Sequence, residues 1–96
     1  MTSLRKPDLR SVSHPETLLM VLRGLYDQLQ PSGVLMAVPT SETVRDPQSL
    51  LVCLTKMYGA AFILGAKNLP RPTTKMVTAP QSLTNWLVKL YTEATA

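Results

Sequence analysis

Cysteine, histidine and carboxylates are scarce in this chain of 96 residues, which has one Cys, one His and six Asp or Glu. A single cysteine excludes an internal disulfide framework and a metal site built from several cysteines, and it suits a reducing compartment. The carboxylates are scattered, so their spacing offers no acid pair and no metal-binding cluster. Catalysis needs at least two groups with matched proton affinities. We therefore expect no enzyme, no cofactor, no metal and no small-molecule substrate.

The lone histidine and the lone cysteine both have structural interpretations. His14 lies between Ser13 and Pro15, where a helix is expected to begin. Cys53 lies on the apolar stripe of an expected helix, where it should behave as a small buried hydrophobic residue. The four glycines are far apart, which excludes a glycine-rich phosphate loop. The sequence gives neither His14 nor Cys53 a catalytic partner.

Charge is low as well, since 17% of the residues are charged and 45% are hydrophobic. This balance excludes a solvated disordered chain and favours a packed core. The net charge of +4 comes from the shortage of carboxylates, because ten Lys and Arg are an ordinary number for this length. The length itself fits one domain over residues 1–96.

Long hydrophobic runs are absent. The cationic N-terminal segment is followed by no apolar run before Pro15, so we expect no secretory signal. The most apolar run, 57–66, is about half of the ~20 residues that a membrane span requires. We therefore expect a cytoplasmic protein without a membrane span.

The positions of proline and tyrosine reveal an internal repeat. Segments 7–26, 39–58 and 72–91 align without gaps, at offsets of 32 and then 33 residues. The identical positions are Pro7/Pro39/Pro72, Val12/Val44/Val77, Pro15/Pro47/Pro80, Leu18/Leu50/Leu83, Leu22/Leu54/Leu87 and Tyr26/Tyr58/Tyr91. They include six of the eight prolines and all three tyrosines. The pattern predicts three repeat units, at about 6–37, 38–70 and 71–96.

The residue pattern of each unit predicts an extended arm followed by one amphipathic helix. The Pro-x4-Val arm should be extended, because proline restricts its own φ and the residue before it. Helices should begin near 14, 47 and 79, where Ser13 and Thr78 fit capping boxes and Asp46 fits an N-cap. The apolar stripes are Leu18, Val21, Leu22, Leu25, Tyr26 and Leu29; Leu50, Cys53, Leu54, Met57, Tyr58 and Ala61; and Leu83, Trp86, Leu87, Leu90, Tyr91 and Ala94. The sequence thus predicts an all-α, three-helix domain built from a threefold repeat of about 32–33 residues.

Residues beside the stripes distinguish the units. Leu51 and Val52 of the second helix are apolar, whereas the third helix has Thr84 and Asn85 at the aligned positions. This difference predicts a middle helix that is buried on two sides and a terminal helix that is buried on one. The apolar segment 34–38 has no clear partner strand, so we interpret it as a buried extended segment.

Surplus apolar residues favour a helical protein-interaction or self-assembly module, such as a small accessory or adaptor protein. Three helices with one stripe each make a small core, and small domains commonly gain stability from partners or from self-association. The candidate interface residues are Leu19, Met20, Val34, Leu35 and Met36. We expect the partner to be another protein or a second copy that forms a homo-oligomer.

A nucleic-acid-associated protein is the alternative. Two basic arms, 5–10 and 67–75, precede equivalent helices and could converge into one positive patch. Their cations are Arg5, Lys6, Arg10, Lys67, Arg71 and Lys75. Aromatic residues are lacking near either arm, which disfavours readout of single strands by stacking.

Overall fold

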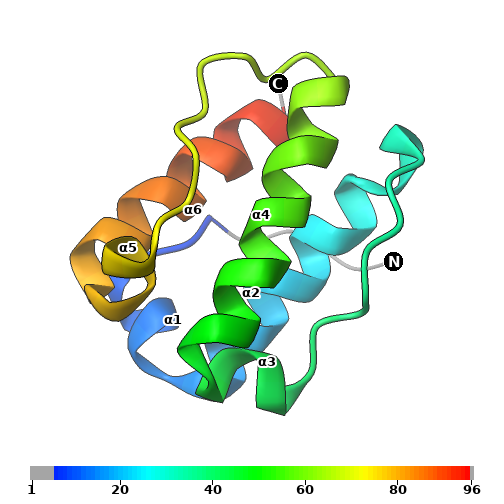
Figure 1. The fold of residues 1–96 in the computed structure, drawn as a ribbon. Coiled ribbons are helices and arrows are strands. Elements are labelled where there is room, and N and C mark those ends of the chain that lie inside the picture. The colour runs from blue at the N-terminus through cyan, green and yellow to red at the C-terminus, as the bar shows by residue number, and fades with distance from the viewer. Residues whose placement is uncertain (1–5, 96) are drawn as a thin grey trace.

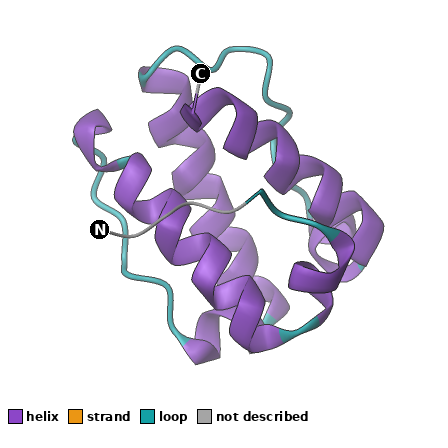
Figure 2. Ribbon diagram, turned by 180° about the vertical axis from the view of Figure 1, so that it is seen from behind, coloured by secondary structure: helices purple, strands orange, loops and turns teal. Residues whose placement is uncertain are grey.

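The computed structural model describes residues 6–95, and within them every regular element is a helix (Figures 1 and 2). The elements are α1 (Leu9–Ser13), α2 (Pro15–Gln28), the 3-10 helix η1 (Gln30–Ser32), α3 (Ser41–Arg45), α4 (Pro47–Ile63), α5 (Thr74–Thr78) and α6 (Pro80–Thr95). The all-α prediction is confirmed. The prediction of three helices is wrong, because a short helix, α1, α3 or α5, precedes each of the long helices α2, α4 and α6.

The predicted extended arms are short helices because a capping residue follows each arm proline. The side chains of Asp8, Thr40 and Thr73 accept hydrogen bonds from backbone N–H groups three residues later, at 2.7, 3.4 and 3.2 Å. Such a bond satisfies a donor that has no partner inside the helix and so favours the first turn. Proline restricts the residue before it, and a helix that begins two residues after it is unaffected.

The second proline of each unit ends the short helix and starts the long one. His14, Asp46 and Ala79 are held in extended backbone conformations by the proline that follows. The long helices then begin at 15, 47 and 80, which confirms the predicted starts to within a residue. Asp46 is the predicted N-cap and accepts a hydrogen bond from the Ser49 hydroxyl at 2.9 Å.

The predicted capping boxes at Ser13 and Thr78 are wrong. Both residues are the last of a short helix, and their hydroxyls donate back to carbonyl oxygens of that helix. A capping box does occur at the start of α3. There, the side-chain oxygens of Thr40 and Thr43 each accept a hydrogen bond from the backbone N–H group of the other residue.

One apolar core joins the predicted stripes. All stripe residues are either buried or partly buried against this core, and Leu22, Leu54 and Leu87 are each 0% exposed. The three repeat tyrosines, which close the stripes, are partly buried at its margin. The arm prolines Pro7, Pro39 and Pro72 are buried as well.

Each short helix packs between two long helices. α1 contacts α2 and α6, α3 contacts α2 and α4, and α5 contacts α4 and α6. Figure 1 shows the consequence, with α1 (blue) beside the start of α6 (orange) although they come from opposite ends of the chain. The helices therefore close on one another, and none of the long helices occupies the end of a row.

This closure explains why the predicted difference between the second and third helices is wrong. Val52 on α4 is 57% exposed, whereas Thr84 on α6 is 6% exposed. The Thr84 hydroxyl donates to the Pro80 carbonyl oxygen at 2.7 Å, which removes the penalty for burying it. The burial of these side chains follows contacts between distant segments, which the apolar pattern alone does not encode.

Segment 34–38 has no regular secondary structure, as predicted, but the prediction that it is buried is wrong, because none of its residues is fully buried. Val34 and Met36 pack partly buried against the core, whereas Leu35 between them is 90% exposed. This alternation is that of an extended chain, in which successive side chains point to opposite sides. The segment is therefore covered on one side only.

Candidate functional site

The predicted interface residues divide into covered and exposed side chains. Leu19, Val34 and Met36 are partly buried. Met20 is 65% exposed and Leu35 is 90% exposed. Met20 and Leu35 are therefore the two candidates that present most of their side chains to another molecule.

A second exposed apolar surface lies on α4. The side of this helix that faces the core carries Leu50, Leu54, Met57 and Ala61. On the opposite side Val52 is 57% exposed and Ile63 is 61% exposed. These two residues are separated by about three helical turns, so they lie on one line along the helix. We call Val52, Lys56, Gly59 and Ile63 the outer face of α4.

Gly59 lies in the middle of this outer face. A Cβ built on Gly59 meets no atom of the described residues within 4 Å, so packing inside the chain does not require a glycine there. A glycine in a helix interior is destabilising by about 0.8–1 kcal/mol relative to alanine. A glycine has no Cβ, so it lets another backbone approach closely. The outer face thus combines exposed apolar side chains with a notch that the monomer does not use.

The predicted basic residues are only partly brought together. Arg71 and Lys75 line one groove with Lys89, a third cation that the sequence interpretation did not include. Lys6, Arg10 and Lys67 are exposed but do not line this groove, and Arg5 lies outside the described residues. The signal for Lys89 was its alignment with Lys56, which places a lysine three residues after the stripe position of Cys53 and of Trp86.

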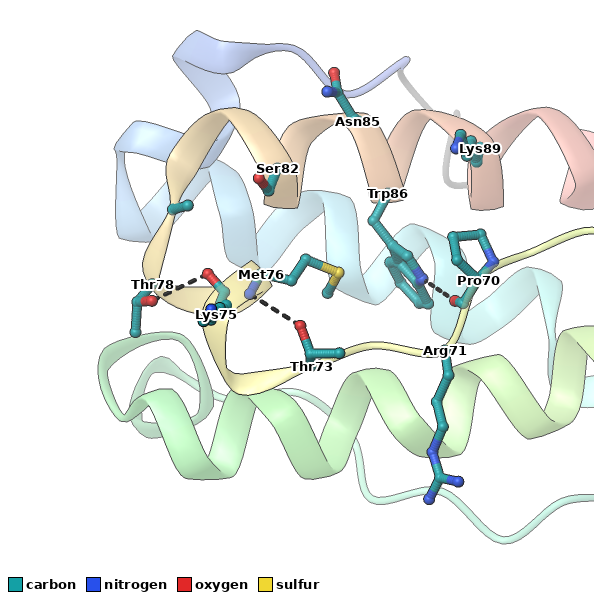
Figure 3. Close-up of a pocket in the computed structure, with 11 residues that line it drawn as sticks. Pro70, Arg71, Thr73, Lys75, Met76, Thr78, Ser82, Asn85, Trp86 and Lys89 are labelled. Carbon is teal, nitrogen blue, oxygen red and sulfur yellow. Dashed lines mark hydrogen bonds between the residues drawn. The ribbon is translucent and has the colours of Figure 1, made fainter.

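This groove, which we call the α6 groove, lies between segment 70–73, α5 and α6 and has a volume of about 650 Å³. Its wall on α6 consists of Ser82, Asn85, Trp86 and Lys89, whose spacing puts them on one helix face. In Figure 3, Arg71 extends away from α6 on one side of the groove, and Lys89 lies on the other. Of the described residues that line the groove, none is Asp or Glu. The surface is therefore concave and positively charged.

Trp86 forms the inner end of the α6 groove and is 2% exposed. Its indole N–H donates to the carbonyl oxygen of Pro70 at 2.6 Å, as the dashed line in Figure 3 shows. The indole ring therefore stands between α6 and the incoming segment 70–73 and holds that segment at a fixed distance. Met76 of α5, 9% exposed, adds a second apolar side chain beside it.

A smaller groove occurs at the aligned positions of the preceding unit. This α4 groove has a volume of about 90 Å³ and is lined by Met36, Ala37, Thr43, Ser49, Val52, Cys53 and Lys56. Cys53 aligns with Trp86, Val52 with Asn85, and Lys56 with Lys89. Lys56 is the one cation among the described residues that line the α4 groove. The two grooves thus share backbone positions and differ in size and charge.

The lone histidine and cysteine have local partners. The ring Nδ1–H of His14 donates to the carbonyl oxygen of Arg10 at 3.0 Å. Cys53 is a free thiol packed partly buried against the core, and burial raises its pKa from 9.0 to about 11. A thiol with a raised pKa is a poor nucleophile at neutral pH, because the thiolate is the reactive form.

Comparisons with known proteins assign no family: no family model matches the chain, and no curated protein or solved structure matches it. Within residues 6–95, no helix has both the length and the apolar character needed to cross a membrane. In the same part of the chain, no three His, Cys, Asp or Glu side chains are grouped so that they could hold a metal ion.

Proposed function

We propose that this chain is a non-enzymatic helical interaction module that associates with a second copy of itself through the outer face of α4. The observation that carries the proposal is the exposure of Val52 and Ile63 on either side of Gly59. A helix that is apolar around its whole circumference is normally covered on all sides. α4 carries apolar residues on its outer face as well as on its core side, yet Val52 and Ile63 on the outer face are uncovered in the monomer.

A second copy suits this surface because identical faces can pack about a twofold axis. The notch at Gly59 would let two α4 helices approach closely where their faces cross. Lys56 lies on the same face, and its long apolar stem can cover the neighbouring helix while its ammonium group stays in water. Burying apolar surface is favourable by about 25 cal/mol per Å², so side chains of this size contribute measurably.

Sedimentation velocity over a concentration series of the whole chain tests the proposal. We expect a dimer that forms as the concentration rises, and a monomer for Val52→Asp, because assembly would bury an unpaired charge. Gly59→Leu should also give a monomer by filling the notch. Both variants should keep the helical circular dichroism of the parent, since neither position is packed inside the chain.

Thr92→Asp on α6 is the matched control, because it adds the same charge at another exposed helical position. It should leave the dimer intact. A parent chain that stays monomeric at every concentration would contradict self-association. A dimer that survives Val52→Asp and Gly59→Leu but is lost in Met20→Asp would move the interface to α2.

We also propose that the fold is a threefold repeat closed into a ring. The sequence alignment supports this, as does the cyclic order in which each short helix contacts its own long helix and a neighbouring one. If the units are equivalent, Leu22→Ala, Leu54→Ala and Leu87→Ala should destabilise by similar amounts, within the 2–5 kcal/mol typical of buried leucines. Urea denaturation of the three variants provides the measurement. A much larger loss for Leu54→Ala would favour an open row with a dominant middle unit.

Nucleic-acid association stays the alternative function. The gathering of Arg71, Lys75 and Lys89 along one groove supports it. The burial of Trp86 weighs against stacking of single-stranded bases there, because stacking needs an accessible ring face. The experiment on the α6 groove described below includes an oligonucleotide for this reason.

A further inference from the structure

We propose that the α6 groove binds a short acidic peptide segment of a partner protein, one in which carboxylates alternate with apolar side chains. This inference concerns a surface other than the outer face of α4 and does not depend on self-association. It stands on the charge of the groove, on its apolar inner end and on its contrast with the α4 groove.

Charge selects an anionic ligand. Three cations, Arg71, Lys75 and Lys89, line the groove and come from three different parts of the chain, segment 70–73, α5 and α6. No carboxylate among the described lining residues neutralises them. A concave surface of one sign concentrates counter-charges, which raises the local concentration of an oppositely charged ligand. Because the cations are spread around the groove, a chain with several carboxylates complements them better than one small anion.

The inner end of the groove selects an apolar side chain next to the carboxylates. The accessible apolar surface there comes from Pro70, which is exposed, and Ala79, which is partly buried, because Trp86 and Met76 are themselves only 2% and 9% exposed. The Ser82 hydroxyl and the Asn85 amide on α6 also line the groove and supply hydrogen-bonding groups for a peptide backbone. The volume of about 650 Å³ fits a few residues of an extended peptide.

These features favour a peptide over a nucleic acid. The Trp86 ring is 2% exposed and its N–H is occupied by Pro70, so it offers no stacking face and no free donor to a base. A nucleic acid would use the cations but would leave the apolar inner end without a partner. A peptide that alternates acidic and apolar side chains uses both.

Trp86 is the only tryptophan of the chain, so its fluorescence reports directly on the α6 groove. The probe is a synthetic peptide in which glutamates alternate with leucines, titrated into the whole chain at low and at moderate salt. We expect a saturable change in fluorescence that weakens as salt is added. A peptide with glutamine in place of glutamate should bind at least about fivefold more weakly, because it lacks the charges.

Lys89→Gln should weaken binding of the glutamate peptide about fivefold. Lys67→Gln is the matched control, because it removes the same charge from an exposed lysine that does not line the α6 groove, and it should leave the affinity unchanged. Both lysines are exposed, so neither variant should disturb folding, which thermal melting checks. Repeating the titration on Val52→Asp separates this inference from self-association, since the peptide should bind that variant as it binds the parent.

Three results would overturn the inference. One is the absence of a saturable signal, verified by titration calorimetry in case the fluorescence does not respond. Another is an equal loss of affinity in Lys67→Gln and Lys89→Gln, which would show non-specific attraction. The third is tighter binding of a thymidine oligonucleotide than of the glutamate peptide, which would assign the groove to nucleic acid.

Discussion

The α6 groove and the α4 groove occupy aligned positions of the chain, yet one has a volume of about 650 Å³ and the other about 90 Å³. The larger groove has the larger residue at its inner end, Trp86 in place of Cys53. If the side chains only filled the grooves, the larger Trp86 would leave the smaller volume. We interpret the difference as an effect of these side chains on the position of the incoming segment.

The hydrogen bond at Pro70 gives the physical reason. The indole reaches from α6 to segment 70–73 and is tied to it by a hydrogen bond of 2.6 Å to the Pro70 carbonyl oxygen. In the α4 groove, Met36 and Ala37 line a smaller space together with Cys53. The small thiol of Cys53 has no comparable reach, so we expect it to leave the position of segment 34–38 to other contacts.

Among the variants of the two grooves, removal of the Trp86 indole should cause the largest loss in the free energy of unfolding. Trp86→Ala should lower the free energy of unfolding by about 3–5 kcal/mol, because it empties a buried volume and leaves the Pro70 carbonyl without its donor. Cys53→Ala at the aligned position should cost only about 1 kcal/mol. Urea denaturation followed by circular dichroism measures both. Equal losses in the two variants would mean that Trp86 does not support segment 70–73.

Placing a tryptophan in the α4 groove should cause a smaller loss of stability, through overpacking. Cys53→Trp forces an indole into about 90 Å³ under Met36 and Ala37. Overpacking of this sort costs about 1–3 kcal/mol. We also expect faster proteolysis within segment 34–38, because the ring would push that segment outward. A variant as stable and as resistant as the parent would show that the α4 groove can open without strain.

The helix caps that precede the two grooves should matter about equally. Thr40→Ala and Thr73→Ala each remove a side-chain acceptor at the start of a short helix, and such losses are typically about 1 kcal/mol. Thr40→Ser and Thr73→Ser keep the acceptor and serve as controls. Thermal unfolding of the four variants distinguishes the cases. Serine variants as unstable as the alanine variants would assign the loss to the missing methyl group.

The prediction with the smallest expected change in stability concerns the Cys53 thiol. Because burial raises its pKa to about 11, the native thiol should react with a maleimide at pH 8 roughly a hundredfold more slowly than free cysteine. The stability that accompanies this shift is fully present below the unfolded value near 9 and is lost as pH rises through about 11. Cys53→Ala should lack that alkaline loss. Labelling as fast as that of free cysteine would contradict the observed burial.

Local features of the fold were predictable because they depend on neighbouring residues. The helix starts at Pro15, Pro47 and Pro80 follow from the effect of proline on the residue before it. The buried stripes follow from helical periodicity. The short helices were also encoded locally, by Asp8, Thr40 and Thr73, but their capping role is visible only if the residue after each arm proline is considered.

The candidate site was predictable only in part. The sequence pointed to Arg71 and Lys75 as cations of one arm, and to Met20 and Leu35 as surplus apolar residues. It did not point to Lys89, which reaches the same groove from a different helix. The exposure of Val52 was missed because the apolar residues beside the stripe of α4 predict burial on two sides of that helix.

By itself, the sequence determined where the three long helices begin and which face of each of them packs against the core. These properties depend on backbone restrictions and on periodicity within about twenty residues. The tertiary structure alone decided that α1 contacts α6, that Val52 and Ile63 on the outer face of α4 stay uncovered, and that the Trp86 indole bonds the Pro70 carbonyl oxygen. Each of these depends on contacts between residues that lie in different elements, and such contacts leave no periodic signal in the sequence.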